Sequence, residues 1–152
     1  MRKLAVSAAT LASISSFGVA QADNCVGNDV LVNLYANTLE VSKGHSMTTS
    51  VDYSVLTTDD VKNIYHNATG QCSGTFLATP DGKVAGSGFC IRKDKDGDTQ
   101  SISFDLKPGA DKGGWKSVGG TGKFAGKTDS GWFQAAVNDG KMSVARWGGT
   151  CK

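Results

Sequence analysis

Proline and histidine are scarce in this chain, which contains two of each among 152 residues. His45 and His66 lie far apart in the sequence, and the four cysteines form no Cys-x-x-Cys pair. Structural zinc sites are built from closely spaced pairs of such ligands, so the spacing argues against one. The sequence indicates neither a metal ion nor a cofactor.

Runs of a single charge are also missing. The chain has 16 basic and 14 acidic residues, and no cluster of Lys or Arg forms a basic stripe. Without Arg2 and Lys3 at the start, 14 residues of each sign remain. A nucleic-acid partner is not expected, because phosphate binding requires a concentrated positive surface. No apolar run after residue 22 is long enough to cross a bilayer.

The first 22 residues have the pattern of a secretory signal peptide. Two basic residues precede an uncharged run over residues 4–19, and Ala20-Gln21-Ala22 is a small-x-small cleavage site. Cleavage after Ala22 leaves 130 of the 152 residues, which is enough for one domain with one buried core over residues 23–152. We expect an exported bacterial protein, either periplasmic or secreted.

Four cysteines in an exported chain of this size predict two disulfides, for which three pairings are possible. The segment Thr79-Pro80-Asp81-Gly82 favours a hairpin whose three-residue loop pairs Thr79 with Lys83. The same register places Cys72 opposite Cys90, a position that disulfide geometry accepts. Cys25 and Cys151 then form the second bridge, which ties the two ends of the domain together.

Most of the chain has the pattern of antiparallel β structure, with 20 glycines and short alternating segments separated by Asp-Gly pairs. Asp96-Gly97 and Asp139-Gly140 are interpreted as two-residue turns. The first turn pairs Phe89 with Phe104, and the second pairs Phe133 with Arg146. Combining the first two hairpins places Cys72 and Cys90 on one face of the sheet and an apolar set on the other: Leu77, Phe89, Ile91, Ile102, Phe104 and Leu106.

Residues 47–55 alternate as a further strand, and Thr58 is placed to cap a short helix over residues 59–66. A sheet with one apolar face must bury that face, either by closing on itself or by packing. We therefore predict an all-β fold, a closed antiparallel β-barrel of about eight strands with one short helix.

The stretch Gly119-Gly120-Thr121-Gly122-Lys123-Phe124-Ala125-Gly126 resembles a signature of the allene oxide cyclase/dirigent-like β-barrel proteins. The Cys-Ser-Gly-Thr of residues 72–75 and the Asp-Gly-Asp of residues 96–98 fit secreted bacterial proteins of this type. The resemblance covers residues 45–150 and implies a calycin-like barrel of eight antiparallel strands, whose cavity takes an apolar ligand. We assign none of the family enzymes' catalytic residues to positions in this chain.

Two competing motifs are incomplete. A phosphate-binding loop around Gly122-Lys123 requires glycine where Ser117 stands and a hydroxyl residue where Phe124 stands. The aspartates at 94, 96, 98 and 105 have the spacing of calcium-loop ligands, but glycine is fourth in that loop rather than sixth. The Asp96-Gly97 pair is better explained as a turn.

Four side chains are candidate ligand-binding residues: Arg146, Phe133, Tyr53 and Trp115. The register of the last hairpin predicts that Arg146 lies inside the barrel or at its mouth and touches Phe133. A buried guanidinium needs an anionic partner, so this position points to a ligand. The alternative places Arg146 at the rim, solvated or stacked on Trp115 or Trp132.

Three functions are compatible with these patterns. The first is a non-catalytic barrel that binds a small apolar ligand, since no catalytic set is recognisable. The second is a cyclase or isomerase that uses Arg146, Tyr53 and one histidine as inward ionisable groups. The third is a cell-surface interaction module with Trp132 and Trp147 as an exposed aromatic patch. The sequence leaves open whether the protein is an enzyme and whether it forms an oligomer.

Overall fold

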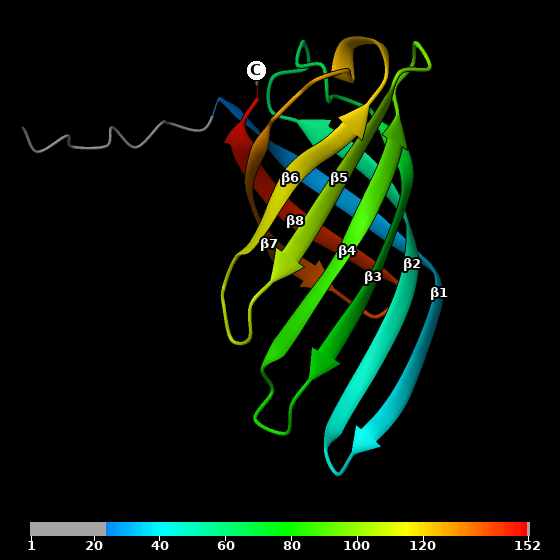
Figure 1. Cartoon of the computed structure of the whole chain (residues 1–152), viewed down its shortest axis with the longest axis vertical. Helices are drawn as coiled ribbons and strands as arrows, with labels where there is room; N and C mark the ends of the chain where they lie inside the picture. The colour runs from blue at the N-terminus through cyan, green and yellow to red at the C-terminus, as the bar shows by residue number, and fades with distance from the viewer. Residues whose placement is uncertain (1–23, 152) are drawn as a thin grey trace, which may run out of the picture.

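The computed structural model describes residues 24–151, so the predicted signal peptide lies outside the described residues. Eight antiparallel strands close into a barrel in which each strand pairs with its sequence neighbours and the last pairs with the first (Figure 1). The strands are β1 (Cys25–Ser42), β2 (His45–Thr58), β3 (Thr69–Ala78), β4 (Val84–Lys93), β5 (Thr99–Leu106), β6 (Gly113–Gly120), β7 (Ser130–Asn138) and β8 (Met142–Thr150). The predicted all-β, closed eight-stranded barrel is confirmed. Among the described residues, no helix is long and apolar enough to cross a membrane.

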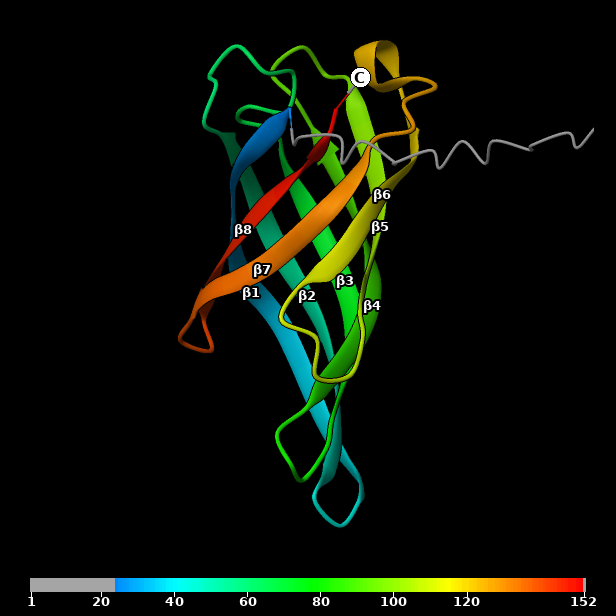
Figure 2. The same ribbon diagram turned by 90° about the vertical axis from the view of Figure 1, so that its left-hand side faces the viewer.

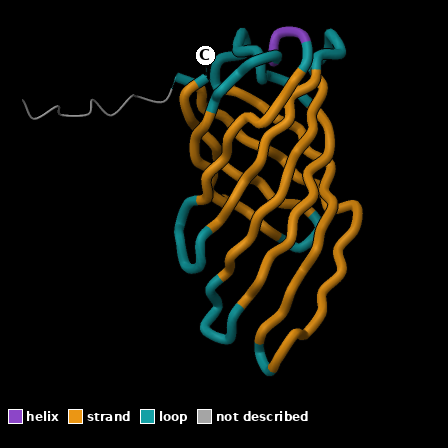
Figure 3. Tube along the Cα trace, in the orientation of Figure 1, coloured by secondary structure: helices purple, strands orange, loops and turns teal. Residues whose placement is uncertain are grey.

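The two ends of the barrel differ (Figures 1 and 2). The connections over residues 59–68, 94–98 and 121–129 gather at one end, together with the start of β1 and the end of β8. We call this the closed end, because buried side chains fill it. The four short turns lie at the other end, which we call the mouth. There the β1–β2 hairpin extends past the rest of the barrel (Figure 3).

The first hairpin has the predicted register. The Thr79 amide donates to the Lys83 carbonyl at 3.0 Å, and Cys72 is the direct partner of Cys90 across β3 and β4. Both predicted disulfides, Cys72–Cys90 and Cys25–Cys151, are present. The turn and the cysteines were independent indications of one register, and both were correct.

The predicted register of the second hairpin is wrong by one residue. The loop contains three residues, because the Asp94 amide donates to the Asp98 carbonyl at 3.0 Å and Gly97 takes the positive φ of 89°. The Asp94 side chain holds this turn by accepting from the amides of Asp96 and Asp98 at 2.9 Å each. A shift of one residue turns every side chain to the other face.

That shift moves three predicted core residues to the outer wall. Phe89 pairs with Ser103 rather than Phe104, and Phe89 and Ile91 are each 61% exposed, while Leu77 is 41% exposed. Ile102, Phe104 and Leu106 do face the interior, as predicted. The Cys72–Cys90 disulfide shares the inner face with them, contrary to the prediction.

The third hairpin also differs from the prediction. Its loop is Gly140-Lys141, closed by the Asp139 amide donating to the Met142 carbonyl at 3.1 Å. A bulge between Ala135 and Val137 then changes the register once more. As a result Arg146 pairs with Gln134, not with Phe133.

The predicted helix over residues 59–66 is absent. Consecutive turns replace it, since the amides of Asn63 and His66 each donate three residues back, at 2.9 and 3.0 Å. The side chains of Asp60 and Asn63 accept from the amides two residues ahead, which favours turns over a continuous helix. The described helical structure is one 3-10 turn, η1 (Gly122–Phe124), at the closed end.

The outer surface of β1 and β2 is largely apolar, whereas their inner surface is polar. Asn33, Ser50 and Asp52 line the interior. Exposed apolar side chains of the same two strands include Val32, Leu34, Tyr35, Leu39, Val41 and Tyr53. The barrel therefore has one polar interior wall, which faces an apolar wall contributed mainly by β3 to β7.

Candidate functional site

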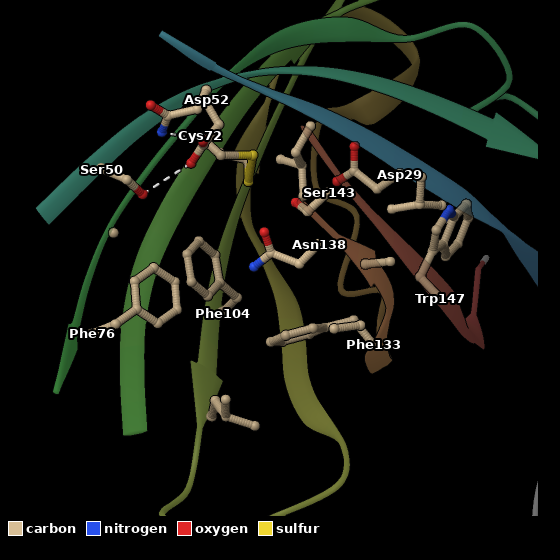
Figure 4. Close-up of a pocket in the computed structure, with 18 of the residues that line it drawn as sticks. Asp29, Ser50, Asp52, Cys72, Phe76, Phe104, Phe133, Asn138, Ser143 and Trp147 are labelled. Carbon is tan, nitrogen blue, oxygen red and sulfur yellow. Dashed lines mark hydrogen bonds between the residues drawn. A yellow bond between two sulfur atoms is a disulfide. The ribbon is translucent and has the colours of Figure 1, made fainter. Parts of the chain in front are cut away.

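The barrel encloses a cavity of about 650 Å³ that runs from the closed end to the β7–β8 turn at the mouth. Its apolar wall is formed by Phe76, Ile102, Phe104, Leu106, Trp115 and Phe133, and its polar lining includes Asp29, Asn33, Ser50, Asp52, Arg92 and Gln100. Figure 4 shows the rings of Phe76, Phe104 and Phe133 on one side and Asp29, Ser50 and Asp52 on the other, with Trp147 beside Asp29.

Three phenylalanine rings form a continuous aromatic surface on the apolar wall. Phe76 and Phe104 are stacked with ring centroids 6.2 Å apart, and Phe104 meets Phe133 edge-on at 6.0 Å. Glycines provide the space for these rings. A Cβ at Gly86 would lie 2.2 Å from the Phe76 ring, and a Cβ at Gly113 would lie 2.1 Å from the Phe133 ring. Because these glycines have no side chain, the rings pack directly against the backbone of the barrel wall and leave the middle of the barrel open.

A buried ionic group forms the floor of the cavity. Arg92 is paired with Asp29, and its Nε donates to the Ser54 hydroxyl at 2.8 Å. The Ser54 hydroxyl donates in turn to Asp29 Oδ1 at 2.6 Å. Arg92 and Asp29 are 3% and 8% exposed, so this ion pair lies in a medium of low polarity. Buried charges of this kind persist only when they are paired and hydrogen-bonded.

Gln100 completes the floor. It is the direct partner of Arg92 across β4 and β5, lines the cavity, and is 3% exposed. Its Oε1 is buried and has no hydrogen-bond partner among the described residues. We refer to Asp29, Ser54, Arg92 and Gln100 together as the polar floor.

The polar wall has its own hydrogen-bonded group nearer the mouth. The Asp52 carboxylate accepts from the Asn33 amide group and from the Ser50 hydroxyl, both at 2.9 Å. Cys72 of the Cys72–Cys90 disulfide is the direct partner of Asp52 across β2 and β3, and Arg92 Nη2 is 3.5 Å from Cys72 Sγ. A molecule in the cavity thus meets aromatic rings on one side and polar groups on the other.

The closed end lies beneath the floor and is filled by aromatic side chains. Tyr65 stacks on Phe124 at 5.4 Å and meets Trp147 edge-on at 6.2 Å, and all three are at most 5% exposed. The Tyr65 hydroxyl donates to the buried Asp129 carboxylate. Burial first, and this hydrogen bond second, raise the pKa of Tyr65 far above its ordinary value. Tyr65 therefore stays protonated and acts as a donor that satisfies Asp129.

The glycine-rich signature is part of this closed end. Phe124 comes from it, and Gly122 takes a φ of +52° in a position where a Cβ would collide with Asp98. Lys123 forms ion pairs with Asp94 and Asp96. Burial raises the pKa of Asp94, but the Lys123 ammonium and two backbone amides outweigh it and keep that pKa below its usual value. The signature fastens η1 to the β4–β5 turn and closes the barrel.

Two of the four candidate ligand-binding residues line the cavity. Phe133 belongs to the aromatic surface, and Trp115 lies deeper, with its Nε1 donating to the Gly148 carbonyl at 3.2 Å. Tyr53 does not line the cavity; it is 40% exposed on the outer surface of β2.

The predicted inward position of Arg146 is wrong. Both terminal nitrogens of Arg146 donate to Asp59, Nη1 at 2.8 Å, on the exterior of the barrel. The hydrogen bonds from Arg146 hold the pKa of Asp59 below its ordinary value. The physical cause is the register, since β8 is displaced by one residue from the predicted pairing and the side chain points outward.

The groups on which the other two functional hypotheses depended are also elsewhere. Tyr53 and Arg146 lie on the outer surface of the barrel. His45 hydrogen-bonds with Ser42 at the β1–β2 turn, and His66 hydrogen-bonds with Thr58 at the closed end. An isomerase built on these groups has no support. Trp147 is 5% exposed and inside the barrel, so it does not form the predicted surface patch with Trp132.

Sequence reasoning missed the whole polar floor. Arg92 follows Cys90 by two positions, so a strand places both side chains on one face. The predicted register placed that face outside, and Arg92 was therefore not among the candidate residues. The signal was present in the sequence, because a register that places the Cys90 side chain on the inner face also places the Arg92 side chain there.

Comparisons with known proteins give no family. Neither the scan of protein-family models nor the search of curated proteins returns a match to this chain.

Proposed function

We propose that this protein is an exported barrel that binds a small, largely apolar molecule in its interior. The observation that carries the proposal is the cavity of about 650 Å³ with its surface of three phenylalanine rings. Its volume is within the range of about 300–1,000 Å³ that is typical of small-molecule sites. Such sites combine an apolar lining with a few polar groups that fix orientation, as the polar floor does here.

Export is supported by the two disulfides, since such bonds persist mainly in oxidising compartments such as the bacterial periplasm or the exterior. We also propose a distant relationship to the allene oxide cyclase/dirigent-like barrels. The closed eight-stranded antiparallel topology, which the resemblance implies, supports this relationship.

Binding is tested with N-phenyl-1-naphthylamine, a dye whose fluorescence increases in apolar surroundings. Ala145 lines the cavity, so Ala145→Phe places a ring inside it. Ala85 is not among the lining residues and follows Val84, which is one of them. Since alternate side chains of a strand face opposite sides, Ala85→Phe adds the same ring to the outer wall and is the matched control.

We expect the wild type and Ala85→Phe to bind the dye equally, and Ala145→Phe to bind it at least about tenfold more weakly. Equal binding by all three proteins would place the dye on the apolar outer surface of β1 and β2. That result, or no binding by the wild type, would refute the proposal.

A further inference from the structure

The polar floor contains hydrogen-bonding groups that the protein leaves unused. Gln100 Oε1 has no partner among the described residues, although the residue is only 3% exposed. Arg92, which also lines the cavity, donates to Ser54 through Nε and to Asp29 and Cys72 through Nη2, and a guanidinium has five N–H donors in all. Buried polar groups in folded proteins are nearly always satisfied, so unused ones at the bottom of a cavity indicate a polar group of the occupant.

The two groups are neighbours. Arg92 and Gln100 are direct partners on adjacent strands, and both line the cavity. A terminal amide offers an acceptor and two donors, while a guanidinium offers donors alone. The bound group must therefore accept from Arg92 and must also be able to exchange a hydrogen bond with the Gln100 amide. A hydroxyl group does both, because it has one donor and two acceptor lone pairs.

The charges around the floor favour a neutral group. The positive charge of Arg92 is already paired with Asp29, and the Asp52 carboxylate lies in the polar wall nearer the mouth. A carboxylate on the ligand would add a third negative charge to this enclosed space. An ammonium group would meet the Arg92 guanidinium. Either charge would be desolvated without a free counter-charge at the floor, which is strongly unfavourable.

We propose that the occupant is an uncharged alcohol with an apolar, ring-containing body, whose hydroxyl binds Gln100 and Arg92 at the polar floor. This inference rests on the proposed function and specifies its ligand class. Along β5 the floor at Gln100 is followed by Ile102 and Phe104, which also line the cavity. Four residues of strand span about 13 Å. A body of about that length, with its hydroxyl at the floor, lies against the aromatic surface of Phe76, Phe104 and Phe133.

The test uses three probes that share one body: naphthalene, 2-naphthalenemethanol and 2-naphthoate. Their dissociation constants are measured by equilibrium dialysis with the full mature chain. The test variant is Gln100→Met, which keeps the length of the side chain and removes its hydrogen-bonding atoms. The matched control is Gln71→Met, because Gln71 is an exposed glutamine outside the cavity lining.

For the wild type and Gln71→Met we expect the alcohol to bind at least about 5- to 10-fold more tightly than naphthalene, the low end of the effect of two additional hydrogen bonds. The carboxylate should bind more weakly than the alcohol. In Gln100→Met the preference for the alcohol should fall by about half or more, to what the Arg92 hydrogen bond alone provides, while naphthalene binds as before. The melting temperature of ligand-free Gln100→Met should equal or exceed that of the wild type, because an unsatisfied buried group has been removed.

The outcomes separate this inference from the proposed function. If naphthalene binds but the alcohol binds no better, or if the carboxylate binds best, the ligand class is wrong and the binding function stands. If the preference for the alcohol in Gln100→Met equals that of the wild type, the assigned head-group site is wrong. If none of the probes binds the wild type, both proposals fail. The wild-type comparison needs no variant, so it holds even if Gln100→Met does not fold.

Discussion

Replacing Phe124 with alanine tests the role of the glycine-rich signature in closing the barrel. Phe124 is 1% exposed and stacks on Tyr65. A phenylalanine buries about 150–250 Å² of surface, which corresponds to about 4–6 kcal/mol at 25 cal/mol per Å² and is an upper bound. Phenylalanine-to-alanine changes in protein cores cost about 3–5 kcal/mol, and we expect Phe124→Ala to fall in that range.

The matched control is Phe89→Ala, the same change on the outer wall. Since Phe89 is 61% exposed, about two fifths of its surface is covered, and the same reasoning gives a cost of about 1–2 kcal/mol. Urea unfolding of the disulfide-intact chain measures both values. With a slope of about 2 kcal/mol per M, the midpoints should fall by about 2 M and about 0.7 M respectively. If Phe89→Ala costs as much as Phe124→Ala, Phe89 is buried and the β4–β5 register described above is incorrect.

Three further predictions concern bonds that fasten the barrel. Arg146→Met should lower the unfolding free energy at pH 7, and by progressively less as the pH falls below 3.8, because a carboxyl whose folded-state pKa is lowered, as that of Asp59 is, loses its stabilising contribution as it becomes protonated in the folded state. An effect in urea titrations that does not decrease with falling pH would contradict the ion pair. Replacing both cysteines of Cys25–Cys151 with serine should lower the unfolding free energy by about 5 kcal/mol, and replacing both of Cys72–Cys90 by about 3 kcal/mol. The difference follows from the sequence separations of 126 and 18, because a longer closed loop restricts the unfolded chain more. Calorimetry that ranks the two variants in the opposite order would show that loop length does not set the effect. Tyr65→Phe should lower the unfolding free energy by about 1.5–3 kcal/mol, because it removes a hydrogen bond to the buried Asp129 carboxylate. In the wild type, ultraviolet titration should show one tyrosine that ionises far above pH 10.0.

The sequence was sufficient for the fold and for one hairpin, where two independent signals coincided. The Thr79 turn and the Cys72–Cys90 spacing required the same register, so an error in either would have been visible. No such second signal accompanied Asp96-Gly97. Yet Asp94-Lys95-Asp96-Gly97 has the same form as Thr79-Pro80-Asp81-Gly82, with a hydrogen-bonding polar side chain first and glycine fourth, and both make three-residue loops. Comparison of the two turns would have corrected the register.

The candidate site was less predictable, because strand faces depend on registers that were wrong by one residue. Phe133 and Trp115 were placed in the cavity although the reasoning for Arg146 failed. The bulge at Ala136 has no sequence signal that we can identify, since alanine is not the residue that bulges favour. The burial of Arg92 could not be inferred from residue type, because charged side chains are usually exposed unless a partner such as Asp29 is known.

The pairing of β1 with β8 has a consequence for how the chain reaches its native state. Every other pair of neighbouring strands is consecutive in sequence, but this pair joins Cys25 to Gly149, which are 124 residues apart. Contacts of such long range form slowly, so ring closure should limit the folding rate. Until then both strands are unpaired edges, open to pairing with other chains and thus to aggregation. The Cys25–Cys151 bond lies at one end of this pair, where strand pairing holds the two cysteines together, and once formed it keeps the ends of β1 and β8 from separating.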